Sequence, residues 1–365
     1  MKDRPRFRIQ LGLDRFSGLY LWAAFIVMFT IWTPLFFTSA TVHSVASGQA
    51  VAGILTVGLL IPLVAGVFDL SVGATANVTA ISVIQLQTAD HLGIALSIVL
   101  SVALGALIGV VNGFLVVVFK INSFIATLAM GSVLAALLTI FTNNEEPSPP
   151  SDPAWSQLTQ RSLGGFQIVF VYFLVIAILV WWGLEHTPAG RYMRVIGSNT
   201  EAARLSGVPV GRWIWISLIC SGTISGLAGI AFSSLLGPSL TFGQELLLPA
   251  FAAAFLGSTQ LTPGRFNVWG SVIAIYVLAT GIQGFQFVTG VQWLSDMFYG
   301  VALIAAVAFA GWRYRAAGNR LRPRDWSRAV GGHATDAGDV AEPSDLTAVS
   351  NILPHAEPTE QAEDT

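Results

Sequence analysis

Two neighbouring stretches decide the fold: FQIVFVYFLVIAILVWWGL (166–184) and TPAGRYMRVIGSNTEAARLSGVPV (187–210). The first is an unbroken apolar run of about the 20 residues that a helix needs to cross the hydrocarbon core of a bilayer. The second is a short charged loop, and it is followed by another apolar run at 212–236. This alternation predicts an all-α, polytopic membrane protein.

The composition of the whole chain indicates the same class. Of its 365 residues, 54% are hydrophobic and only 10% are charged, whereas soluble domains carry about 25% charged residues. The net charge of −2 combines a basic N-terminus with an acidic tail, and this distribution offers no basic surface for nucleic acid. The single cysteine, Cys220, excludes a disulfide within one chain and a cysteine metal site.

Successive apolar runs predict about ten transmembrane helices when short or broken ones are allowed. Their ranges are 19–37, 49–68, 71–88, 93–119, 123–141, 166–184, 212–236, 246–257, 267–287 and 292–311. The eighth is too short for a perpendicular helix, so we expect a re-entrant or broken segment there. The transmembrane domain is predicted to cover 16–312, between a basic segment (1–15) and a polar tail (313–365) that we expect to be disordered.

The positions of lysine and arginine predict the orientation of these spans. With an even number of spans and a cytoplasmic N-terminus, only Arg161 of the 18 basic residues falls on the external side of the membrane. Removing one span would invert every later loop and destroy this pattern. We therefore predict that both termini and the 185–212 loop are cytoplasmic, and that the proline- and acid-rich loop at 142–165 is external.

Within the charged loop, the residues predict one short helix of about two turns. Ser198 with Glu201 three positions later has the spacing of a capping box, and Gly207 followed by Pro209 is typical of a helix end. So short a helix is marginal alone in water and must pack against its own chain or a partner.

Two interpretations of this helix remain open. Arg204 follows Glu201 at ion-pair spacing, and Ala202 with Ala203 gives one side so little bulk that another protein can approach the backbone. The helix is then a docking surface. Alternatively, it is an ordinary capped helix that only connects two spans.

No catalytic or nucleotide-binding motif occurs in the sequence. It contains no glycine-rich phosphate loop ending in Lys-Ser or Lys-Thr, no HExxH motif and no Cys/His cluster. We therefore expect no enzymatic activity and no cofactor or metal in this chain.

A few polar residues lie within or between the apolar runs. Asp69, beside Ser71, is an acid between two spans, so it has a role either in the translocation pathway or in capping the next helix. Asn77, Asn112 and Asn122 are neutral hydrogen-bonding groups, which suit a polyhydroxylated solute and suit contacts between helices equally well. We take these five residues as a candidate translocation pathway.

Small residues recur at four-residue spacing on two predicted spans. Gly105, Gly109 and Gly113 share one face of the first, and Gly222 and Gly226 share one face of the second. This spacing predicts helix faces that pack closely against neighbours.

The sequence resembles the membrane permease subunits of bacterial ABC importers for ribose and related monosaccharides. The resemblance rests on DLSVGATANVTA (69–80), VNGFLVVVFKINSFIATLAMGSVLAALL (111–138) and the 187–210 loop, and it covers nearly all of 19–312. The chain departs from the family at 65–68, where Ala-Gly-Val-Phe replaces a segment with two glycines.

By this resemblance, the 187–210 loop is the coupling helix that docks in a cleft of the cytoplasmic ATPase. The predicted coupling residues are Gly190, Arg191, Gly197, Asn199, Glu201, Ala202, Ala203, Arg204 and Gly207. The resemblance also implies a location in the bacterial cytoplasmic membrane and a homodimer or a pair with a paralogous permease. The other implied partners are cytoplasmic ATP-binding subunits, which use the ATP, and an extracytoplasmic sugar-binding protein.

The implied function is import of a monosaccharide, such as a ribose-like pentose, by alternating access. The same architecture also suits a nucleoside, a branched-chain amino acid, a polyol or a furanose signal. An ion-coupled secondary transporter is a different class, and it would need charged groups within the membrane, for which Asp69 is nearly the only candidate. A membrane scaffold without transport is a third class.

Overall fold

The computed structural model describes residues 13–33, 36–291 and 293–320. The described residues up to Ala316 form one compact unit. The predictions for residues 1–12 and for the tail beyond residue 320 lie outside the described residues. The elements are α1 (Leu13–Trp32), α2 (Ser39–Gly48), α3 (Ala50–Val64), α4 (Val72–Thr88), α5 (Ile94–Val117), α6 (Ser123–Thr142), α7 (Pro153–Gln160), β1 (Ser162–Leu163), β2 (Phe166–Gln167), α8 (Ile168–His186), α9 (Pro188–Ser198), α10 (Thr200–Leu205), α11 (Val210–Leu235), α12 (Phe242–Gly257), α13 (Val268–Thr289) and α14 (Trp293–Arg320).

The all-α class is confirmed, and every predicted span coincides with a helix. The second span differs most: it begins earlier, at Ser39, and it consists of α2 and α3 joined at Gln49. The predicted start of the sixth span is wrong by two residues, because Phe166 and Gln167 form strand β2. The final helix extends into the predicted tail as far as Arg320.

The helices at the predicted spans differ in length and hydropathy. In the described part of the chain, six helices are long and apolar enough to cross a membrane, and Phe16–Trp32, Phe242–Gly257 and Trp293–Ala308 are shorter apolar helices. Helix α4 belongs to neither group. It is buried along most of its length and packs on α5, α6, α11 and α12, so its polar residues face protein.

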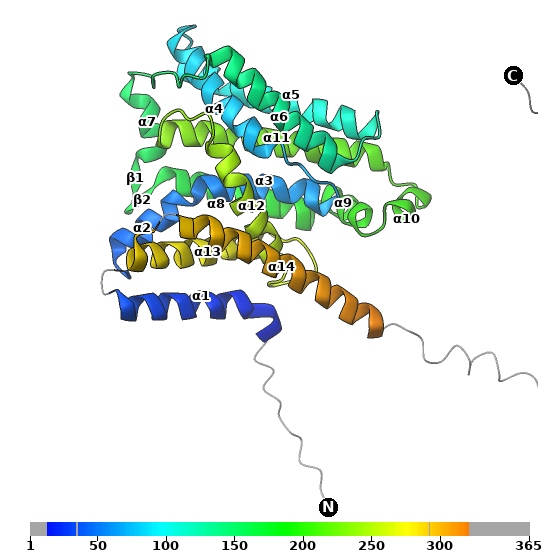
Figure 1. The fold of residues 1–365 in the computed structure, drawn as a ribbon. Coiled ribbons are helices and arrows are strands. Elements are labelled where there is room, and N and C mark those ends of the chain that lie inside the picture. The colour runs from blue at the N-terminus through cyan, green and yellow to red at the C-terminus, as the bar shows by residue number, and fades with distance from the viewer. Residues whose placement is uncertain (1–12, 34–35, 292, 321–365) are drawn as a thin grey trace, which may run out of the picture. The chain divides into compact units, whose positions relative to one another are not determined.

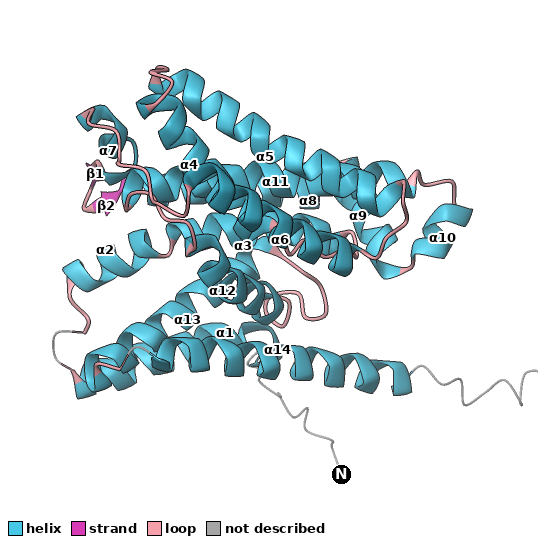
Figure 2. Cartoon of the chain, turned by 45° about the horizontal axis from the view of Figure 1, so that its top comes forward, coloured by secondary structure: helices cyan, strands magenta, loops and turns pink. Residues whose placement is uncertain are grey.

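Helices α3 and α11 form the centre of the bundle (Figures 1 and 2). All residues of α3 are buried, and α11 packs against α3, α4 and α5. The predicted glycine faces meet here: a Cβ atom added to Gly105 of α5 would lie 2.6 Å from the carbonyl oxygen of Gly222 of α11. These two helices can approach so closely only because neither residue has a side chain.

The two long loops lie at opposite ends of the helices. Helix α7 and the β1–β2 hairpin, from the 142–165 region, are at one end, and α9 and α10 are at the other (Figures 1 and 2). This is the arrangement that loops on opposite sides of a membrane require. Which end faces the cytoplasm stays a prediction from the distribution of basic residues.

Candidate functional site

The charged loop contains two helices rather than one. Helix α10 begins after Asn199, whose extended backbone (φ −160°, ψ 101°) and side chain make it the N-cap: its Oδ1 accepts a hydrogen bond from the Ala202 amide at 3.0 Å. The predicted capping box of Ser198 and Glu201 is therefore wrong. Ser198 is still helical, as the last residue of α9, and an N-cap residue must have non-helical backbone angles.

Helix α9 was not predicted, although the sequence carries a signal for it. Thr187 precedes Pro188 in the way that an N-cap precedes proline at the first helical position. Met193 and Ile196, three residues apart, are buried on its inner face. The 11-residue helix thus lies flat against the end of the bundle instead of projecting from it.

Helix α10 presents a mixed outer face. Ala203 is fully buried with Ile196 and Val210, whereas Ala202 is exposed, so the predicted alanine face is divided between inside and outside. Glu201 and Arg204 are exposed and form the expected ion pair at 3.2 Å. Leu205 is 88% exposed at the tip. Leu205 and the neighbouring ion pair form the surface at which the predicted docking would occur.

The remaining predicted coupling residues have distinct local positions. Gly190 is buried against Leu184 at the turn between α8 and α9, and Arg191 is exposed on α9. Gly207 has a φ of +78°, a conformation that favours glycine, and it ends α10. Whether these residues contact an ATPase stays a prediction.

The C-terminal end of α9 contacts the end of α3 through backbone atoms. A Cβ atom added to Gly66 (φ +79°) would lie 2.9 Å from the Cα atom of Gly197, and one added to Gly197 would collide with the carbonyl oxygen of Val64. Both positions therefore need glycine. The sequence did not show this contact, because the two residues are far apart along the chain.

The segment after Gly66 is irregular and is held by helix α6. Between Val67 and Leu70 the chain is not helical. The amide of Phe68 donates to Ser123 Oγ at 3.1 Å, and the amide of Leu70 donates to Thr127 Oγ1 at 2.9 Å. Side chains at the start of α6 thus replace the helical hydrogen bonds that this buried backbone lacks.

Asp69 lies in this segment and is fully buried. Its Oδ1 accepts hydrogen bonds from the Ser71 amide at 3.1 Å and the Ser71 hydroxyl at 2.6 Å, and Asn112 Nδ2 of α5 donates to that hydroxyl at 2.7 Å. Among the described residues, Asn112 Oδ1 has no hydrogen-bond partner, and the Ser221 hydroxyl of α11 lies beside the Asp69 carboxylate. Helix α4 begins after Ser71, and its N-cap has no side-chain hydrogen bond, so Asp69 binds the amide of the N-cap residue and no amide of the helix itself. The role of Asp69 therefore stays a prediction, and the Asn112 oxygen is hydrogen-bonding capacity that the fold leaves unused.

The other two candidate pathway residues have separate partners. Asn77 Nδ2 donates to the Leu240 carbonyl, and its Oδ1 accepts from the Gly243 amide, both at 2.7 Å, so it connects α4 to the start of α12. Asn122 is exposed and caps α6 by accepting from the Phe124 amide at 3.0 Å. The structure therefore gathers Asp69, Ser71 and Asn112 into one network that excludes Asn77 and Asn122.

No metal centre is found in the part of the chain that the structure describes, where no three His, Cys, Asp or Glu residues are placed to hold an ion. The polar network of Asp69 contains one acid and neutral groups. Its chemistry is hydrogen bonding.

Residues 41–307 match the family described as branched-chain amino acid transport system / permease component. The chain belongs to this permease family. The match includes both the network of Asp69 and the α9–α10 loop, and it confirms the family that the three motifs indicated. The protein is a multi-pass membrane permease.

Several of the curated relatives that match are named as permeases for sugars, and another is named as a permease for autoinducer 2. The chain is 30% identical to the fructose import permease FrcC of Rhizobium meliloti over 286 residues, which cover 76% of this chain and 79% of the relative. It is 30% identical to the L-arabinose permease AraH of Escherichia coli over 311 residues, which cover 83% and 92%. The ribose import permease RbsC of Escherichia coli is 30% identical over 258 residues, covering 67% and 78%. No solved structure matches the chain significantly.

Proposed function

We propose that this chain is the membrane-spanning subunit of a bacterial ABC importer for a monosaccharide. The observation that carries the proposal is the direct contact between α9 and Gly66, the residue immediately before the irregular segment that holds Asp69. In this proposal, the α9–α10 loop receives the movement of the ATPase, and the polar segment between α3 and α4 moves with it. The names of the relatives, permeases for fructose, arabinose and ribose, support the class of cargo.

The proposed mechanism begins at the exposed side of α10. A cytoplasmic ATPase binds around Leu205, Glu201 and Arg204, and closure of its nucleotide sites displaces α9 and α10. Because Gly197 touches Gly66 without an intervening side chain, the displacement reaches the 65–71 segment directly. That segment is tied to α5 through Asn112 and to α6 through Thr127, so these helices move with it. Rocking of helices in this way is how alternating access is achieved.

The cargo is proposed to be neutral because the polar groups available to it are mostly neutral. Asn112 and Ser71 can exchange hydrogen bonds with sugar hydroxyls, and Asn112 Oδ1 is an acceptor that has no partner among the described residues. The pathway itself is proposed to form between two copies of the chain, or one copy and a paralogue. An extracytoplasmic binding protein delivers the sugar to the end that carries α7.

Reconstitution tests this proposal. The purified chain alone in vesicles should neither hydrolyse ATP nor concentrate a sugar. Addition of its ATPase and binding protein should produce ATP-dependent uptake of labelled ribose, arabinose or fructose. Uptake driven by an ion gradient without the ATPase would contradict the proposed class, and ATP-dependent uptake of a branched-chain amino acid but of no sugar would contradict the proposed cargo.

A further inference from the structure

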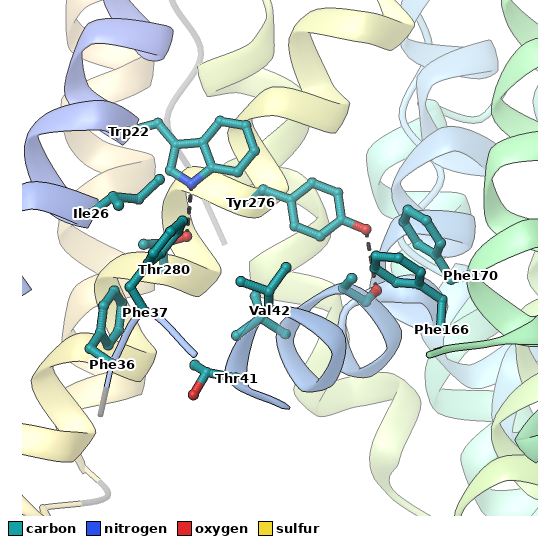
Figure 3. Close-up of a pocket in the computed structure, with 12 residues that line it drawn as sticks. Trp22, Ile26, Phe36, Phe37, Thr41, Val42, Phe166, Phe170, Tyr276 and Thr280 are labelled. Carbon is teal, nitrogen blue, oxygen red and sulfur yellow. Dashed lines mark hydrogen bonds between the residues drawn. The ribbon is translucent and has the colours of Figure 1, made fainter. Parts of the chain in front are cut away.

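A cavity of about 290 Å³ lies among α1, α2, α8 and α13, away from the network of Asp69 (Figure 3). Aromatic rings form much of its wall, with Trp22 and Tyr276 on one side and Phe166 and Phe170 on another (Figure 3). Nothing in the proposed transport mechanism uses this space.

The polar side chains that line the cavity already have partners. Trp22 Nε1 donates to Thr280 Oγ1 at 2.9 Å, and the Tyr276 hydroxyl donates to the Ala46 carbonyl at 3.2 Å. Thr41 shares a hydrogen bond with Thr38 at 3.0 Å. A sugar placed here would lose its hydrogen bonds to water and find few replacements, which is unfavourable. The cavity therefore suits an occupant that makes no hydrogen bonds.

The mouth of the cavity opens on an apolar part of the protein surface. Phe37 and Val42 line the cavity and are also 60% and 40% exposed. Val42 belongs to the candidate membrane span Ser39–Val64, and Ile26 to the apolar helix Phe16–Trp32. An apolar opening between two such helices is in contact with hydrocarbon tails, not with water.

We propose that this cavity binds the acyl chain of a phospholipid, with its terminal part between Trp22 and Phe170. The volume fits: an apolar protein cavity of about 150 Å³ holds a benzene molecule, and this one has nearly twice that space. The cavity adjoins α2 and β2, at the end of the bundle opposite α9 and α10 (Figure 1). In the predicted orientation the lipid therefore comes from the outer leaflet. This proposal is independent of the identity of the cargo.

Photolabelling of the full chain in vesicles tests the proposal. The vesicles contain phosphatidylglycerol and phosphatidylethanolamine, with a trace of phospholipid that carries a diazirine near the end of one acyl chain. After irradiation, mass spectrometry should find adducts on Trp22, Val42, Val45 or Phe170 at about tenfold higher yield than on Val99, an exposed residue of α5 that does not line this cavity.

Two variants sharpen the test. Val45→Trp fills the cavity with an indole ring and should lower the labelling of the lining residues about tenfold, whereas the matched Val99→Trp should not change it. Equal yields at the lining residues and at Val99 in the wild-type chain would overturn the proposal, and so would labelling that Val45→Trp leaves unchanged. The wild-type comparison decides the matter even if Val45→Trp fails to insert.

Discussion

The loop that contains α7 and the loop that contains α10, at opposite ends of the helices, differ in how far they pack on their own chain. At the α7 end, Trp155 is buried, its carbonyl accepts from Ser234 Oγ at 2.6 Å, and Gln160 Nε2 donates to the Leu235 carbonyl at 2.8 Å. That loop is closed onto helix α11 of its own chain. At the other end, α10 leaves Leu205 and a charged pair in the open. The hairpin beside α7 also exposes Leu163 to 64%, so the difference lies between helices α7 and α10 themselves, and completion of the α10 end by another protein is our proposal.

The comparison also shows how each loop is connected to the core. Side chains and hydrogen bonds attach α7 to α11, whereas α9 contacts the break after α3 through the backbones of Gly197 and Gly66. A backbone contact transmits displacement without a flexible side chain to absorb it. Three substitutions test this comparison, and they are ordered by their expected effect on the free energy of unfolding.

The largest effect is expected for Trp155→Ala in the α7 loop. Removing a buried aromatic side chain of this size costs about 3–5 kcal/mol of stability. The thermal unfolding temperature of the purified chain should fall, and ATPase binding at the opposite end should persist in the folded fraction. Trp182→Ala, which removes an exposed tryptophan of α8, is the matched control and should change little. Equal losses for the two variants would show that the α7 loop is not anchored by Trp155.

A smaller loss of stability, about 1–3 kcal/mol from overpacking, is expected for Gly197→Ala, with a large loss of sugar uptake. The added methyl group meets the Val64 carbonyl and must push α9 away from the 65–71 segment. Uptake per inserted molecule is the measurement.

Gly183→Ala is the control for this variant, because Gly183 is also helical and a Cβ atom there meets nothing. Both changes give the same gain in helix propensity, so the difference between them isolates the contact. Normal uptake by Gly197→Ala would remove the contact from the proposed mechanism.

The smallest effect on stability is expected for Glu201→Arg. The ion pair with Arg204 is exposed, and such pairs contribute about 0–1 kcal/mol. The variant should insert normally and yet fail to bind the ATPase. Two arginines one helical turn apart, at positions 201 and 204, then replace a pair of opposite charges on the proposed docking face. Co-purification of the ATPase with the inserted chain is the measurement, and full uptake by the variant would refute docking at α10.

Sequence patterns predicted the spans well because each long apolar run must be a helix in a bilayer, where irregular backbone exposed to lipid is too costly. The four-residue glycine spacing likewise predicted two close-packing helix faces, and the structure shows that these faces, on α5 and α11, meet each other. The capping position was missed because Ser198 and Asn199 are both good N-caps, and local sequence does not decide between them. The contact of Gly66 with Gly197 and the network joining Asp69 to Asn112 are tertiary, and no periodicity encodes them.

The central claim is that the α9–α10 loop receives the ATPase, and cross-linking at two exposed leucines tests it most directly. Leu205 of α10 is 88% exposed and Leu163 of β1 is 64% exposed, at opposite ends of the helices (Figure 1). A photoreactive residue at position 205 should cross-link to the ATPase subunit in the assembled importer, and one at position 163 should not. Cross-linking of the ATPase from position 163, or from neither position, would contradict the account.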